Sequence, residues 1–172
     1  MTSGIRESDQ ELLAWQLGRQ PRGVVAIAHR CPCGAPDVVQ TLPRLPDGTP
    51  FPTLYYLTCP RLAGEIGSLE GRGLMREMEE RLAQDDCLRT QYRMAHESYL
   101  MERENLGVVA EIDGISAGGM PNRVKCLHVL AAHALAAGPG VNPLGDEVLA
   151  LVDRWWERGA CAQAAEGRES DG

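Results

Sequence analysis

Six cysteines and four histidines are the residues of this 172-residue chain best suited to bind metal ions or to act as nucleophiles. Cys31 and Cys33 lie on either side of a proline, in the run His29-Arg30-Cys31-Pro32-Cys33-Gly34. Pro32 stiffens this loop and Gly34 lets it bend, so backbone N–H groups can turn toward the sulfur atoms. Two thiols on such a loop suit a metal ion or an iron–sulfur cluster. A zinc ribbon normally has Cys-x2-Cys spacing, so the Cys-x-Cys spacing leaves open whether one or both sulfurs bind.

A second candidate, Cys126, lies where the sequence predicts the start of a buried helix. Gly118-Gly119 provides a flexible loop, and Asn122 is a favoured N-cap residue. A broad apolar face then runs from Val124 to Ala137, and Gly138 followed by proline ends the pattern. These signals predict that Cys126 lies in the first turns of the helix.

The position of Cys126 favours a thiolate, which is either a nucleophile or a metal ligand. The positive end of the helix dipole and the neighbouring Arg123 and Lys125 all stabilise a negative charge there. His128 lies roughly 200° around a regular helix, whereas His133 returns to the same face about 10.5 Å further along. Cys126 and His128 are therefore not expected to chelate one ion unless the first turn is irregular. Cys126 and the two histidines can also be ordinary buried residues.

Three short strands precede the helical part of the chain. Their β-branched and aromatic residues place them at 24–28, 36–42 and 53–58. Cys31 and Cys33 follow the first strand, and Cys59 follows the third. If the first and third strands run parallel in one sheet, all three thiols emerge at one edge of that sheet.

The remaining pattern predicts an α+β fold, with about five helices packed on a small, irregular, antiparallel or mixed three-stranded sheet. Residues 1–158 are expected to form a single globular domain. Residues 159–172 are small and charged, so a disordered C-terminal tail is expected there, in which Cys161 is incidental. Cys87 is expected to be a surface or packing residue of a helix.

Composition excludes several classes of function. The net charge of −7 argues against a nucleic-acid partner. There is neither a secretory signal nor an apolar run long enough to span a membrane, so no membrane association and a cytoplasmic location are expected. Cysteines in that compartment are usually reduced, which leaves them as core residues, metal ligands or reactive groups. The common phosphate-loop, zinc-protease, dinucleotide and serine-hydrolase motifs are absent.

Several blocks of sequence resemble the bacterial DUF501 family over roughly residues 18 to 152. The blocks are Arg30-Cys31-Pro32, the run from Pro43 to Thr58 (PRLPDGTPFPTLYYLT), Gly118-Gly119-Met120-Pro121, the run from Val124 to His128 (VKCLH), and the run from Gly140 to Asp146 (GVNPLGD). The resemblance implies that these blocks belong together in one unit of an uncharacterised family. Its members often lie near genes for enolase, a septum-formation coiled-coil protein and an exopolyphosphatase, which implies a link to cell division or phosphate metabolism.

The first hypothesis is one metal site that joins these blocks. Cys31, Cys59 and Cys126 would form it, and its ligand set would be completed by Cys33, His128 or His133. Zinc and an iron–sulfur cluster both suit three or four thiolates. The role would be structural or regulatory.

Two alternatives remain open. In an enzyme, Cys126 would be a thiolate nucleophile with His29 or His133 as its base, and Arg44, Arg123 and Lys125 would bind an anionic substrate. In a protein-interaction module without a metal, the proline-rich hairpin and the Trp155-Trp156 pair would bind a protein partner.

Overall fold

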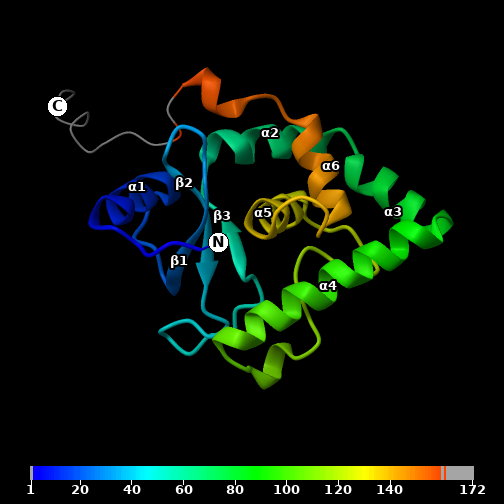
Figure 1. The fold of residues 1–172 in the computed structure, drawn as a ribbon, viewed down its shortest axis with the longest axis horizontal. Helices are drawn as coiled ribbons and strands as arrows, with labels where there is room; N and C mark the ends of the chain where they lie inside the picture. Colours follow the sequence, from blue (N-terminus) through cyan, green and yellow to red (C-terminus); the bar gives the residue numbers. More distant parts are fainter. Residues whose placement is uncertain (1, 160, 162–172) are drawn as a thin grey trace.

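The computed structural model describes residues 2–159 and 161. In chain order the elements are α1 (Glu7–Leu17), β1 (Val24–Arg30), β2 (Pro36–Thr41), β3 (Tyr55–Leu57), α2 (Pro60–Gly71), α3 (Leu74–Gln84), α4 (Asp86–Leu106), a 3-10 turn (Ala110–Ile112), α5 (Leu127–Ala137), α6 (Pro143–Leu151) and a second 3-10 turn (Trp155–Arg158). Six α-helices and one three-stranded antiparallel sheet in the described residues confirm the predicted α+β fold (Figure 1). None of the helices found in this part of the chain is both long and apolar enough to cross a membrane.

The sheet has the strand order β1-β2-β3, and both outer strands are antiparallel to β2. β1 and β3 therefore run in the same direction, which is the condition under which the sequence analysis expected the thiols after these strands to emerge at one edge. Ile27 pairs with Val39, and Val39 pairs with Tyr56 on its other side, while the β1–β2 register shifts at several positions. The segments that follow β1 and β3 consequently leave the sheet at the same edge.

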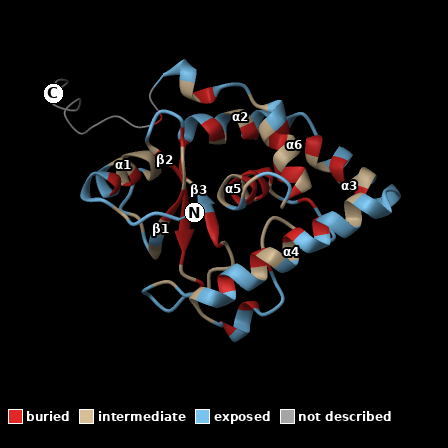
Figure 2. Ribbon diagram, viewed as in Figure 1, coloured by how far each residue is buried: buried red, intermediate tan, exposed pale blue. Residues whose placement is uncertain are grey.

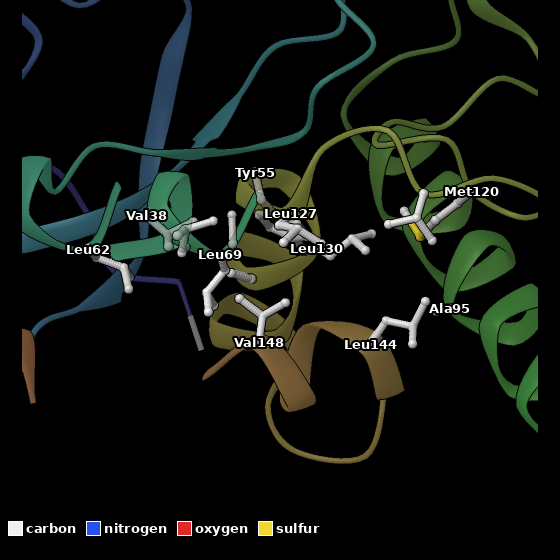
Figure 3. Packing of buried hydrophobic residues seen from close by; sticks show 14 of the residues in the cluster. Val38, Tyr55, Leu62, Leu69, Ala95, Met120, Leu127, Leu130, Leu144 and Val148 are labelled. Atoms are coloured by element: carbon white, nitrogen blue, oxygen red, sulfur yellow. The ribbon is translucent and has the colours of Figure 1, made fainter. Parts of the chain in front are cut away.

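Helix α5 lies at the centre of the molecule and is covered by β3, α2 and α6 (Figures 1 and 2). Leu127, Leu130 and His133 are buried on it, together with several alanines. Figure 3 shows Leu127 and Leu130 among side chains from the sheet, α2 and α6. Gly145 lets α6 approach α5 closely, because a Cβ atom there would overlap the Leu130 carbonyl group. Gly145 on α6 and the buried alanines on α5 are small, and they allow these two helices to pack closely.

α5 begins at Leu127, so the prediction of a helix from Val124 was wrong. Cys126 is the extended N-cap residue, with φ −153° and ψ 110°. The physical reason is a compact loop before it: the Lys125 N–H donates to the Gly118 carbonyl at 2.8 Å, and the Arg123 N–H donates to the Gly119 carbonyl at 2.8 Å. These bonds fold the loop back on itself and leave Cys126 extended, so the helix starts only at Leu127.

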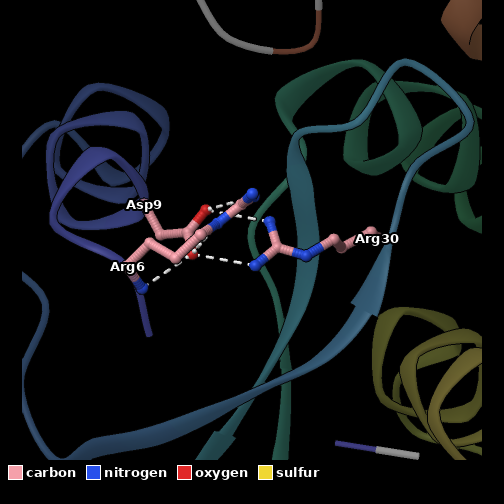
Figure 4. Close-up of polar contacts among 3 residues, drawn as sticks. All are labelled: Arg6, Asp9 and Arg30. Atoms are coloured by element: carbon pink, nitrogen blue, oxygen red, sulfur yellow. Dashed lines mark hydrogen bonds and ion pairs between the residues drawn. The ribbon is translucent and has the colours of Figure 1, made fainter. Parts of the chain in front are cut away.

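Helix α1 is fixed to the sheet by a small apolar cluster and by one buried ion pair. Leu13, Ile27 and Val39 form the cluster. Asp9 is completely buried and accepts two hydrogen bonds of 2.8 Å from the Arg30 guanidinium (Figure 4). Hydrogen bonding to Arg30 holds the pKa of the Asp9 carboxyl well below its usual range, despite burial. This ion pair ties α1 to the end of β1, immediately before Cys31.

Candidate functional site

Three thiols meet at the sheet edge where β1 ends. The sulfur atoms of Cys31, Cys33 and Cys161 all lie within 4.8 Å of one another, a separation at which they can hold a metal ion. Cys31 Sγ lies 3.4 Å from Cys161 Sγ, and both residues are buried, whereas Cys33 is exposed. The prediction that Cys161 is incidental was therefore wrong. The rest of the predicted tail lies outside the described residues, apart from Gly159.

Cys59 is a fourth thiol beside this group. It is completely buried at the start of α2, directly after β3. The Cys59 thiol raises the pKa of Cys161, which contacts Cys31, but Cys59 is not among the three thiols that all lie within 4.8 Å of one another. The thiols that follow β1 and β3 thus lie at the same end of the sheet, because these two strands run in the same direction. We call Cys31, Cys33, Cys59 and Cys161 the four-thiol group.

Backbone N–H groups point at two of these sulfurs. The N–H of Cys33 donates to the Cys31 thiol, and the N–H of Ala35 donates to the Cys33 thiol. Burial raises the pKa of Cys31 to about 11, and burial together with the thiols of Cys31 and Cys59 raises the pKa of Cys161. Burial also opposes ionisation of Cys33, but hydrogen bonds from Ala35, Cys31 and Cys161 outweigh it, so its pKa lies below the usual value. Among Cys31, Cys33 and Cys161, Cys33 is therefore the thiol that loses its proton first.

A second group combines Glu70, Cys126 and His128, whose donor atoms also lie within 4.8 Å of one another. Cys126 Sγ is 4.0 Å from His128 Nδ1, which is 3.1 Å from Glu70 Oε1. The expectation that Cys126 and His128 face opposite sides of a helix was wrong, because Cys126 precedes the helix and only His128 belongs to it. We call these three residues the Glu–Cys–His group.

Electrostatics in the Glu–Cys–His group favour a thiolate beside an imidazolium when no metal is bound. Burial raises the pKa of Cys126, but hydrogen bonds from His128 and from the Val129 N–H outweigh it and lower the pKa below its usual value. The hydrogen bond to Cys126 and the charge of Glu70 raise the pKa of His128 to about 9, against the effect of burial. Sequence reasoning missed Glu70, since nothing in its neighbourhood along the chain distinguishes it from other surface glutamates.

The predicted ligands are therefore divided between two groups instead of joined in one. Cys31, Cys33 and Cys59 belong to one group, and Cys126 and His128 to the other.

His133, which was also predicted as a ligand or base, belongs to neither group. It is buried, and its Nδ1 accepts a hydrogen bond of 3.2 Å from Asn142. Its ring stacks on Tyr55 and meets Tyr99 edge-on, with ring centroids 5.9 and 5.0 Å away. Burial lowers the pKa of His133 to about 4. It is thus a neutral histidine of the core, which is the ordinary alternative that the sequence left open.

The other predicted site residues have partners of their own. His29 Nδ1 lies 2.8 Å from the buried Asp37 on the neighbouring strand. Arg44 forms an ion pair with the Glu111 carboxylate at 2.7 Å, so its guanidinium already has an anionic partner within the chain.

Two further cations were predicted to bind anions. Arg123 contacts the Glu79 carboxylate at 2.7 Å, and the exposed Lys125 also lies in the electrostatic field of Glu79. The predicted anion-binding residues therefore face acidic side chains of the chain itself.

A pocket of about 570 Å³ opens beside the four-thiol group. Trp15, Arg61, Trp155 and Arg158 line it together with Cys161. Trp155 is buried and packs edge-on against Trp156 at 4.6 Å, so it belongs to the core of the chain. Of the four thiol residues, Cys161 is the one that lines this pocket in the described part of the chain.

Comparison with known proteins gives a family but no activity. The model of the family described as "Protein of unknown function (DUF501)" matches residues 27–150. Neither the curated proteins nor the solved structures contain a match to the chain. The matched region includes the whole Glu–Cys–His group and every member of the four-thiol group except Cys161. The match covers well over half of the sequence and confirms the resemblance seen in its motifs, so the chain belongs to the DUF501 family.

Proposed function

We propose that the protein binds one zinc ion through Cys31, Cys33, Cys59 and Cys161, and that this ion has a structural role. The observation that carries the proposal is the approach of these thiols from separate parts of the chain. Zn–S bonds of about 2.3 Å in a tetrahedron place neighbouring sulfurs about 3.8 Å apart. The 3.4 Å between Cys31 and Cys161 is close to that value, and Cys33 lies within 4.8 Å of both, whereas Cys59 would have to move toward these three thiols to complete the tetrahedron.

The close spacing favours a single ion over a cubane iron–sulfur cluster. The thiolates of a cubane bind different iron atoms and therefore lie further apart than the ligands of one ion. The N–H groups of Cys33 and Ala35 would stabilise sulfur atoms that have lost their protons. Four thiolates would also leave no coordination position for a substrate, which is typical of structural zinc sites.

A zinc ion here would stabilise a junction in the fold. The four-thiol group connects the turn after β1, the start of α2 and Cys161. Apart from this group, Cys161 is held by the Gln16 side chain, which donates to its carbonyl at 3.2 Å. Zinc would therefore fix Cys161 against α1 and the sheet.

The experiment is native mass spectrometry of protein purified without chelators and without oxygen. It compares the unaltered protein with Cys33→Ser, which removes the exposed thiol of the group, and with Cys87→Ser, which removes an exposed thiol on α4. We expect the Cys33→Ser variant to contain one zinc ion fewer than both other proteins. A disulfide, seen as the loss of two hydrogen atoms, or equal metal content in all three proteins would contradict the proposal.

A further inference from the structure

We propose that Glu70, Cys126 and His128 form a second zinc site, with Oε1, Sγ and Nδ1 as ligands and a fourth position open to solvent. This site is independent of the structural zinc proposed above. Its donors come from the last turn of α2, the residue before α5 and the first turn of α5, two helices that pack against each other.

The distances between the donor atoms fit one small ion. Zinc bonds of about 2.0 to 2.3 Å in a tetrahedron separate neighbouring nitrogen, oxygen and sulfur ligands by roughly 3.3 to 3.7 Å. The His128 nitrogen is 3.1 Å from the Glu70 oxygen and 4.0 Å from the Cys126 sulfur. Shifts of a few tenths of an ångström therefore suffice to seat an ion between them.

The surroundings orient two of the ligands toward this point. His128 Nε2 lies 3.1 Å from the Ala63 carbonyl oxygen. In neutral histidine, an N–H donated to that carbonyl leaves the Nδ1 lone pair facing Cys126 and Glu70. The Leu127 N–H donates to Glu70 Oε1 at 2.8 Å and holds the carboxylate in place. Such outer hydrogen bonds are typical of histidine and carboxylate ligands of metals.

The same geometry argues against a cysteine–histidine–glutamate catalytic triad. In a triad, the nucleophile and the carboxylate contact opposite nitrogens of the imidazole ring. Here Cys126 and Glu70 both face Nδ1 of His128, and a backbone carbonyl occupies the other nitrogen. Three donors that converge on one point are the arrangement of a metal site.

Charge and exposure indicate which kind of site this is. One thiolate and one carboxylate neutralise Zn²⁺, and neutral His128 adds no charge. The side chains of His128 and Glu70 are 31% and 24% exposed, so solvent reaches the group. Three protein ligands with an open fourth position are typical of zinc sites that bind and activate water, in contrast to closed four-thiolate sites.

Cobalt and azide test the proposal directly. The protein is stripped of metal, loaded with Co²⁺ without oxygen, and titrated with sodium azide while its visible absorption is recorded. The variants are Glu70→Gln, which can still accept the Leu127 N–H bond, and His128→Gln, with Cys87→Ser as the control. Far-ultraviolet circular dichroism checks that each protein is folded.

We expect the unaltered protein and Cys87→Ser to bind two Co²⁺ ions and to change spectrum with azide. Glu70→Gln and His128→Gln should bind one ion fewer and lose the azide response, since a closed four-thiolate site has no position for azide. Retention of both ions and of the azide response in the folded variants would overturn the proposal. If the four-thiol site alone fails, one azide-responsive ion remains and Cys33→Ser does not remove it.

Discussion

Removal of Arg30 tests the junction between α1 and the strand that leads to Cys31. In Arg30→Met, the fully buried Asp9 carboxylate keeps only Arg6, whose side chain is 63% exposed and whose guanidinium bonds are 3.3 and 3.4 Å long. Loss of one partner of a buried ion pair typically costs about 3–5 kcal/mol. Because Arg6 still compensates part of the charge, we expect a loss near the lower limit, about 3 kcal/mol.

The assay is urea unfolding followed by circular dichroism at neutral pH. Arg6→Met is the matched control and should cost less than about 1 kcal/mol, because an exposed ion pair contributes little. The double variant Asp9→Asn/Arg30→Met removes both charges and should recover most of the stability lost in Arg30→Met. Equal unfolding midpoints for Arg30→Met and Arg6→Met, or a double variant less stable than Arg30→Met, would refute this reasoning.

The same pair gives a pH dependence with a defined sign. The pKa of Asp9 is lowered in the folded protein, so the unfolded chain takes up a proton first as the pH falls. The stabilisation by the pair is complete above the unfolded pKa of about 3.9 and is lost progressively below it. A plot of stability against pH should therefore fall less steeply below pH 4 in Asp9→Asn/Arg30→Met than in the unaltered protein.

Three further predictions concern the core and the metal. The pKa of His133 is about 4 in the folded protein, against about 6.5 in the unfolded chain. Lowering the pH from 6.5 to 4 should therefore reduce the free energy of unfolding by about 3 kcal/mol, because the unfolded chain takes up a proton that the folded protein does not. Urea unfolding at several pH values should show this loss in the unaltered protein but not in His133→Gln. In urea unfolding, Gly145→Ala should destabilise the protein by several kcal/mol, because the added methyl group would overlap the Leu130 carbonyl group. Gly67→Ala on α2 is the control: it has open space around it and should be neutral or slightly stabilising. A chelator should lower the thermal unfolding temperature of the unaltered protein more than that of Cys33→Ser, and equal shifts would contradict a structural metal.

Local patterns predicted the elements better than the sites. The strand run before Cys31 and the strand run before Cys59 were visible in the sequence, and the parallel directions of those strands brought both thiols to one edge. The partner of these thiols is Cys161, which follows a stretch with no periodic pattern. Composition around Cys161 describes only its local preference and carries no information about a contact 130 residues away.

The second group was obscured by the boundary of one helix. A favourable N-cap residue, Asn122, suggested a helix that would have turned Cys126 and His128 apart. Backbone hydrogen bonds around Gly118 and Gly119 favour a loop instead, and they delay the helix until Leu127. Pairing rules within one helix therefore gave the wrong geometry, because Cys126 is not helical.

The coordination of zinc in the four-thiol group is the most direct test of the account. Zinc K-edge X-ray absorption of the His128→Gln variant isolates this site, since the second site should then be empty. We predict a shell of four sulfur atoms at about 2.3 Å from zinc. A shell dominated by nitrogen or oxygen, or a folded variant without stoichiometric zinc, would contradict the assignment of Cys31, Cys33, Cys59 and Cys161 as its ligands.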